Sequence, residues 1–221
     1  MRDAIDITIL LDKSGSMSTI ADDTRKSVVS YIRDRVKDLI PATITLRQFN
    51  TTWSDTFEAR PASEITEEWH YQPLGGTALF DALQRSIADT GARLRKLPES
   101  MRPKKVLFVV VTDGEENSSY TTSLEQVKAA ITHQQDKYNW QFIFLGVGID
   151  AFKGGMNLGF NPYATYSVGH NIRGTQLAFA SASAATSNYS SGAVMDAAFT
   201  QDQYDEANKT GGVKNSQRLP K

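Results

Sequence analysis

Near its start the chain reads Ile5-Asp6-Ile7-Thr8-Ile9-Leu10-Leu11-Asp12-Lys13-Ser14-Gly15-Ser16. Its first part is rich in aliphatic and β-branched residues, which is typical of a strand buried inside a sheet. Polar residues then follow at alternate positions, Asp12, Ser14 and Ser16, and Gly15 permits a tight turn. Alternate side chains can point the same way as the chain leaves a strand, so three oxygen-bearing groups are expected to converge there. An ordinary surface turn is the alternative interpretation of Ser-Gly-Ser.

A second apolar run ends in the same manner. The segment 104–112 is rich in valine and apolar on both faces, and Asp113-Gly114 follows it. Parallel strands of an open α/β sheet share one carboxyl edge, and ligands bind along that edge. A turn or helix-capping aspartate is the alternative for Asp113. The matching position of Asp12 makes that alternative weaker.

A third loop offers a hydroxyl group. Gly75-Gly76-Thr77 precedes a helical pattern that starts at Ala78. Taken alone, Thr77 would be an N-cap residue whose hydroxyl accepts a backbone N–H. With the other two loops present, the glycines instead bring the Thr77 hydroxyl close to an ion. Hydroxyls and carboxylates without thiols or clustered imidazoles suit Mg²⁺, Mn²⁺ or Ca²⁺, and Mg²⁺ is the cation we expect.

The three loops resemble the metal-ion-dependent adhesion site of von Willebrand factor type A (vWA) domains, in order and in separation. The resemblance covers about the first 170 to 190 residues and is to the stand-alone intracellular kind of bacteria or phages. It implies that Ser14 and Ser16 are direct ligands and that Thr77 becomes one when a partner is bound. Asp12 and Asp113 would act largely through water. The implied function is a non-enzymatic protein-binding module in which an Asp or Glu of another protein completes the metal's coordination.

Alternating strand and helix patterns predict an α/β fold. We expect a helix after Met17 with an apolar stripe of Val28, Tyr31, Ile32, Val36 and Leu39, and a hairpin of strands over 43–49 and 53–59. Further helices are expected from 79, from 124 and over 172–189, and further strands over 141–147 and 164–168. The resemblance implies a three-layer, doubly wound, mostly parallel six-stranded sheet of order 3-2-1-4-5-6. Its third strand is antiparallel and helices cover both faces.

Composition is that of one domain of ordinary size. The 221 residues include 24 Lys plus Arg and 25 Asp plus Glu, so neither nucleic acid nor a membrane is an expected partner. Cysteine is absent, which excludes disulfides and thiolate metal sites. No leader-like start or membrane-length apolar run is found, and we expect a cytoplasmic protein. We predict a domain over 1–190 and a C-terminal appendage over 191–221, with a disordered tail from about residue 208.

Two other functions compete with this interpretation. One is a Mg²⁺-dependent α/β hydrolase or phosphotransferase with Asp12 as nucleophile. An enzyme of the haloacid-dehalogenase type needs a second carboxylate two positions later, where this chain has Ser14, so the general acid is missing. The other is a structural subunit with a vestigial motif, which the presence of all five motif residues disfavours.

The remaining candidate residues give weak signals. His70, His133 and His170 are far apart and lack zinc-helix spacing, so ordinary surface or partly buried roles are expected. Gly146-Val147-Gly148 follows a strand, but the third glycine of a dinucleotide loop and its helix are missing. Glu115-Glu116 after Asp113 is either a source of negative charge at the rim of the site or a solvated pair.

Overall fold

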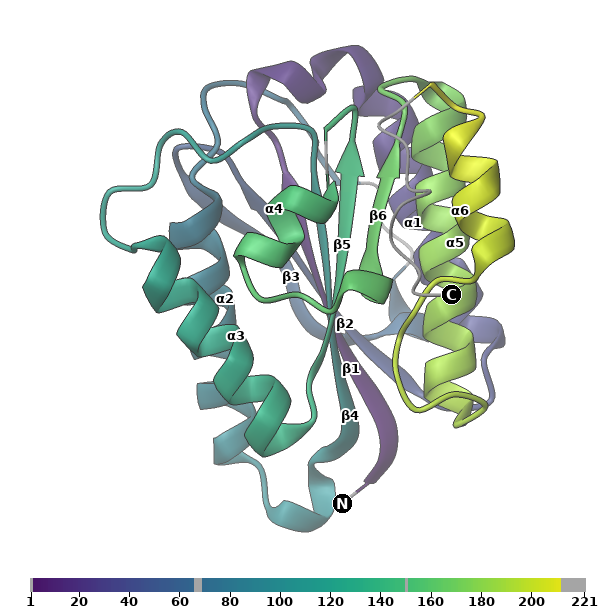
Figure 1. Cartoon of the computed structure of the whole chain (residues 1–221). Helices are drawn as coiled ribbons and strands as arrows, with labels where there is room; N and C mark the ends of the chain where they lie inside the picture. The colour runs from purple at the N-terminus through teal and green to yellow at the C-terminus, as the bar shows by residue number, and fades with distance from the viewer. Residues whose placement is uncertain (1, 66–68, 150, 212–221) are drawn as a thin grey trace.

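A six-stranded sheet of order β3-β2-β1-β4-β5-β6 forms the middle layer of the computed structural model, which describes residues 2–65, 69–149 and 151–211 (Figure 1). Neighbouring strands are parallel except for the antiparallel pair β2 and β3. This confirms the predicted sheet, its order and its one antiparallel strand. The strands are β1 (Arg2–Asp12), β2 (Ala42–Phe49), β3 (Trp53–Pro61), β4 (Pro103–Thr112), β5 (Gln141–Val147) and β6 (Thr165–Val168).

Helices cover both faces of this sheet (Figure 1). One face carries α1 (Ala21–Lys37), α5 (Ile172–Ser191) and α6 (Gln201–Asn208). The other face carries α2 (Leu79–Lys96), α3 (Leu124–Tyr138) and α4 (Ala151–Asn157). Short 3₁₀ turns connect these elements: η1 (Gly15–Ile20), η2 (Ala62–Glu64), η3 (Glu99–Met101) and η4 (Pro162–Ala164). Two apolar clusters result, one on each side of the sheet.

Strand β1 separates the two clusters, because successive side chains of a strand point to opposite faces. Ile7 and Ile9 lie in the cluster beneath α1 and α5. On the α2 face, Asp6 is buried, and its carboxylate accepts two bonds from the Arg93 guanidinium of α2, at 3.0 and 2.8 Å. A buried carboxylate needs such a partner, since an unpaired one would be costly. The pair therefore fixes α2 against β1.

Helix α1 differs from its expected form at both ends. It is preceded by η1, so the α-helix begins at Ala21, and it ends at Lys37. Val36 and Leu39, which we expected on the buried stripe, are 52% and 94% exposed. Arg35 is buried in their place. It donates to Ser183 of α5, a helix rich in small and hydroxylated residues, so the packing at this end of α1 is polar.

The segment after α5 packs on the edge strand β6. The rings of Phe199 and Tyr166 lie with centroids 4.5 Å apart, and the Tyr204 hydroxyl donates to the carbonyl of Thr165 at 3.1 Å. Thr210 is buried as well. At this edge strand the carbonyl of Thr165 is therefore already bonded within the chain. The domain boundary at residue 190 stays a prediction. Disorder was expected from about residue 208, but α6 extends to Asn208 and Thr210 is buried, so residues 208–211 are ordered; the rest of the expected tail, 212–221, lies outside the described residues.

Candidate functional site

Three loops meet at the carboxyl edge of β1 and β4, as the sequence predicts. Backbone hydrogen bonds join the first two loops: the N–H of Gly15 donates to the carbonyl of Gly75 (2.9 Å), and Leu74 N–H donates to Lys13 (2.8 Å). The third loop is joined to the second because Asn117 N–H donates to the carbonyl of Thr77 (3.1 Å). These bonds hold segments distant in sequence in one rigid arrangement.

Four of the five predicted ligands form a continuous hydrogen-bond chain. The N–H of Ser14 donates to Asp12 Oδ1 at 2.7 Å, and the hydroxyls of Ser14 and Ser16 are 3.1 Å apart. The Ser16 hydroxyl in turn donates to Asp113 Oδ1 at 2.7 Å. Thr112 Oγ1 donates to the remaining oxygen of Asp12 at 2.6 Å. Carboxylate and hydroxyl oxygens from two strand ends therefore lie together.

Thr77 joins this group through Gly114. A Cβ at position 114 would lie 2.9 Å from Thr77 Oγ1 and 3.9 Å from Asp12 Oδ2. The glycine of Thr-Asp-Gly thus leaves the space in which these oxygens approach one another. Thr77 does not cap the following helix, because the N-cap of α2 is Ala78, which has no side-chain capping bond. All five predicted residues are accordingly gathered around one point.

The electrostatics of this group favour a cation. The pKa of Asp12 is raised to about 6, chiefly by burial and to a smaller extent by the nearby Asp113 carboxylate, although hydrogen bonds from Thr112 and Ser14 lower it in part. Lys13, the next residue along, turns away and donates to Ser54 Oγ at 2.9 Å. Within the described ranges no three His, Cys, Asp or Glu side chains gather as a metal-binding group. The donor set therefore depends on hydroxyls, and hard, oxygen-preferring divalent cations fit it.

Neighbouring side chains hold the group from outside. The Tyr71 hydroxyl donates to the backbone carbonyl of Asp12 at 2.5 Å. Glu116 is tied into the loop after β4: its carboxylate accepts from the N–H groups of Ser118 and Ser119 and from Phe80 at the start of α2. The solvated-pair interpretation is therefore wrong for Glu116. Glu115 is exposed, which is compatible with either interpretation for that residue.

His170 is the residue that sequence reasoning missed. Its Nε2 lies 2.9 Å from Asp113 Oδ2, the oxygen that Ser16 does not contact. The signal that could have identified His170 is its position two residues after the end of β6, because this places it at the same carboxyl edge of the sheet as Asp12 and Asp113. His70 and His133 are exposed, as is His170, so what distinguishes His170 is its contact with Asp113.

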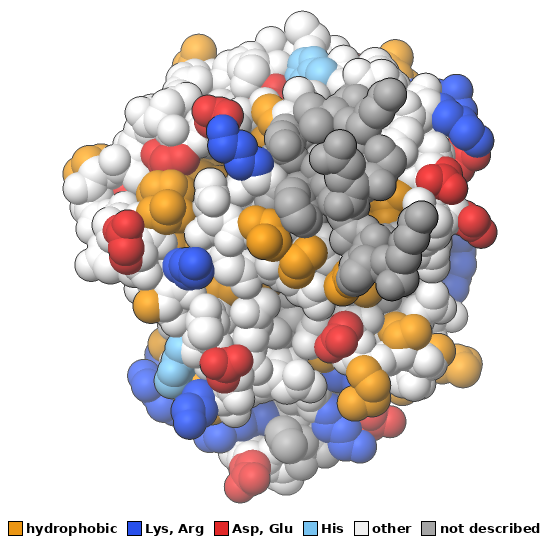
Figure 2. Space-filling model, viewed as in Figure 1, with side chains coloured by type: hydrophobic (Ala, Val, Ile, Leu, Met, Phe, Trp, Pro, Cys, Tyr) orange, Lys and Arg blue, Asp and Glu red, His pale blue; other side chains and the backbone are white. Residues whose placement is uncertain are grey.

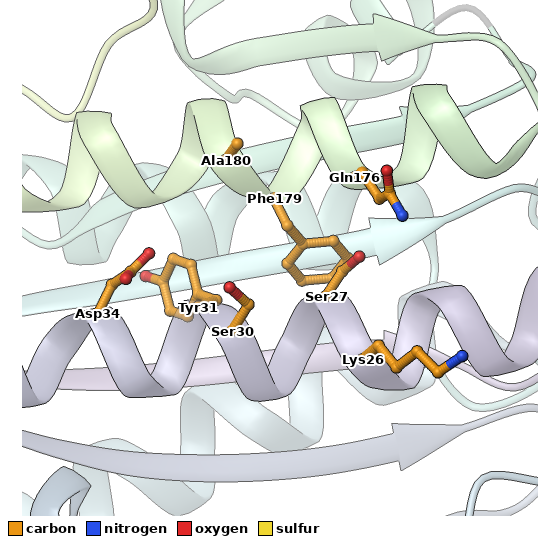
Figure 3. Close-up of a pocket in the computed structure, with 8 residues that line it drawn as sticks. All are labelled: Lys26, Ser27, Ser30, Tyr31, Asp34, Gln176, Phe179 and Ala180. Carbon is orange, nitrogen blue, oxygen red and sulfur yellow. The ribbon is translucent and has the colours of Figure 1, made fainter.

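Cavities of the described structure lie away from this group. A groove of about 310 Å³ separates α1 from α5 and is lined by Lys26, Ser27, Ser30, Tyr31, Asp34, Gln176, Phe179 and Ala180 (Figure 3). A larger cavity, of about 1160 Å³, lies between α2, α3 and the start of β4. Lys and Arg side chains gather at the lower end of the face in Figure 2, the end at which Figure 1 places the N-terminus. Neither cavity is lined by a predicted ligand.

Comparison with known proteins bears on the fold. Neither a protein-family model nor a curated protein matches the sequence. Among solved structures, one crystal form of proximal thread matrix protein 1 from the mussel byssus is similar, with a TM-score of 0.59, 15% identity, and coverage of 83% of this chain and 46% of that one. Another structure of that protein, described with a zinc-occupied MIDAS motif, has a TM-score of 0.55 and 17% identity, with coverage of 76% and 42%.

A von Willebrand factor type A structure from Catenulispora acidiphila is also similar, with a TM-score of 0.52, 15% identity, and coverage of 84% of this chain and 43% of that one. The chain spans less than half the length of these solved structures. At such identities the likeness concerns the fold alone, and the fold is of the vWA type. In the described part of the chain, no helix combines the length and the apolar character that crossing a bilayer requires.

Proposed function

Taking the vWA-type fold as the premise, we propose that this chain is a metal-dependent protein-binding module. Its ligands are Asp12, Ser14, Ser16, Thr77 and Asp113. The observation that carries the proposal is the hydrogen-bond chain from Asp12 through Ser14 and Ser16 to Asp113. An ordinary turn has no reason to bury two carboxylates beside each other, whereas a cation offsets their repulsion.

Each ligand has a separate task at such a site. Asp12 and Asp113 contribute negative charge from buried positions, and Ser14 is buried beside them. Ser16 is exposed and so stands at the solvent side of the group. When bound, a divalent cation would supply a Lewis-acidic centre for a carboxylate of the partner. Mg²⁺ is the ion that we expect, with Mn²⁺ or Ca²⁺ as alternatives.

The loops around the site offer a surface for that partner. Leu74 and Tyr120 are exposed on loops that adjoin the site, where large apolar side chains are available for contact. Two carboxylates balance the charge of one divalent ion, and Glu115 adds a negative charge at the rim. A partner segment that combines an acidic residue with a basic and an apolar one would fit this surface.

Titration calorimetry with Mg²⁺ and Mn²⁺ tests the proposal directly. Ser14→Ala and Ser16→Ala remove hydroxyl ligands and should weaken binding of both ions at least several-fold. Ser18→Ala is the matched control, because Ser18 is exposed in the same η1 turn and outside the predicted ligand set. Equal affinity in all four proteins, or no binding by the unaltered chain, would contradict the proposal.

The hydrolase alternative is tested separately. Both Asp12 oxygens accept hydrogen bonds and the residue is fully buried, which leaves the carboxylate badly placed for nucleophilic attack. We therefore expect no turnover of a generic phosphatase substrate in the presence of Mg²⁺. Turnover that Asp12→Asn abolishes would favour the enzyme.

A further inference from the structure

Both carboxylate oxygens of Asp113 are contacted by side chains, and these two side chains come from distant parts of the sequence. Ser16 donates to Oδ1 at 2.7 Å, while His170 contacts Oδ2 at 2.9 Å across 57 residues of sequence. Because a carboxylate only accepts hydrogen bonds, the Nε2–H of His170 is the donor. The Asp113 side chain is 1% exposed and that of His170 is 33% exposed. The imidazole therefore covers the Asp113 carboxylate from the solvent side.

The backbone around His170 is built for this position. Gly148, at the end of β5, has a φ of +79°, and a Cβ there would lie 2.7 Å from His170 Cβ. Any larger residue at 148 would displace the histidine. Gly148, which belongs to the incomplete dinucleotide-loop pattern of the sequence, thus has a steric role: its lack of a side chain leaves room for His170.

The loop that carries His170 is fastened by the C-terminal segment. Gly169 N–H donates to Thr210 Oγ1 at 2.7 Å, and Asn171 Nδ2 donates to the Thr210 carbonyl at 2.8 Å. Thr210 is itself bound to the end of α6, because its hydroxyl donates to the carbonyl of Ala207 at 2.6 Å. The residues on both sides of His170 are therefore held by one residue near the end of the described chain.

We propose that His170 is a positioning residue of the metal site, which orients Asp113 and is itself held in place by Thr210. This rests on the proposed function. A residue that orients a ligand typically changes metal affinity 10- to 100-fold when it is removed. The C-terminal segment would then belong functionally to the site, although Thr210 itself is a bonding partner of Gly169 and Asn171 and not of Asp113.

Metal titrations of the full chain test the role of His170. His170→Ala should weaken Mn²⁺ and Mg²⁺ binding about 10-fold. His170→Gln, whose amide N–H can reach the same oxygen, should recover most of the affinity, and His133→Ala, at an exposed histidine of α3, should have no effect. Unchanged affinity in His170→Ala, or equal losses in the alanine and glutamine variants, would overturn the proposal.

The link to Thr210 has its own test. Thr210→Val keeps the side-chain shape but cannot accept from Gly169, so it should weaken metal binding, while Thr132→Val on the exposed side of α3 should not. In a His170→Ala background, Thr210→Val should have no further effect. An equal effect in both backgrounds would show that Thr210 does not act through His170.

A separate measurement distinguishes failure of this inference from failure of the proposed function. If the unaltered chain binds no metal, the proposed function fails. The His170–Asp113 contact is then judged from chemical denaturation of the metal-free single and double variants His170→Ala and Asp113→Asn. Non-additive shifts of the unfolding midpoint support the contact, and additive shifts overturn it.

Discussion

Asp12 occupies an unfavourable place for a carboxylate on its own. It is fully buried at the end of β1, and its pKa is raised to about 6, chiefly by burial. The hydrogen bonds from Thr112 and Ser14 lower that pKa, but by less than burial raises it. A residue in this state gains most from a neighbouring positive charge, which is the physical argument for a cation beside it.

The pKa of Asp12 predicts how stability of the metal-free protein depends on pH. The folded state keeps the proton up to about pH 6, whereas the unfolded chain releases it near 3.8. Stability should therefore fall as pH rises from about 4 to about 6, by about 3 kcal/mol for this residue. Asp12→Asn should flatten the curve over that interval. Denaturation of both proteins in chelator at several pH values measures this, and parallel curves would contradict it.

Thr77 separates metal binding from partner binding. If its hydroxyl coordinates directly only in the liganded state, Thr77→Ala should weaken binding of a short Asp- or Glu-containing peptide to the metal-loaded protein more than it weakens binding of the metal alone. Calorimetry gives both affinities, and Thr132→Ala on α3 is the control. A loss of metal affinity with unchanged peptide affinity would refute this role.

At the scale of elements, the loop after β4 and the start of α2 hold each other. Glu116 accepts from Phe80 N–H of α2, and Asp81 of α2 accepts from the N–H of Tyr120 at 3.1 Å. Acidic groups at a helix N-terminus also interact favourably with the helix dipole. The bonds of Tyr120 and Thr121 to Asp81 lower the pKa of that carboxyl. This reciprocal pairing fixes the loop that begins at Asp113.

Replacement of Glu116 should therefore affect stability as well as the site. Glu116→Ala leaves the N–H groups of Phe80, Ser118 and Ser119 without their acceptor and should lower the free energy of unfolding by about 1–3 kcal/mol. Glu115→Ala is the matched control, since Glu115 is exposed, and it should change stability by less than about 0.5 kcal/mol. Equal effects of the two changes would contradict the structural role of Glu116.

At the scale of the whole molecule, the core does not depend on the site. Apolar clusters lie on both sides of the sheet, and β1 contributes Ile7 to one and Leu10 to the other. The five predicted ligands belong to neither cluster. Burial of apolar surface in these clusters, and not coordination of an ion, is the main source of folding free energy.

Removal of the metal should accordingly leave the protein folded. We expect circular dichroism spectra in chelator to equal those with Mg²⁺, unlike a structural zinc site, where binding supplies the folding energy. Added metal should still raise the melting temperature, because a ligand at 100 times its Kd stabilises by about 2.7 kcal/mol. Full unfolding in chelator, or no shift with saturating metal, would contradict this expectation.

Local sequence determined most of the elements and the meeting of the three loops, but it did not predict the helix α6 (Gln201–Asn208) within the expected appendage. Apolar runs that end in Asp12 and Asp113 identify parallel strands whose ends share an edge, and Gly75-Gly76-Thr77 before a helix adds the third loop. These patterns persist because burial on a strand or a helix imposes a period of 2 or 3.6 residues. The sheet order followed only from resemblance to a family, since periodicity does not specify which strands are neighbours.

Tertiary structure alone decided the surroundings of the predicted site. His170 reaches Asp113 over 57 residues, and Gly169 reaches Thr210 over 41 residues. The burial of Arg35 in place of Val36 likewise depends on Ser183 of another helix. Such contacts leave no periodic trace in the sequence, because they pair single residues whose proximity exists only after helices and strands have packed.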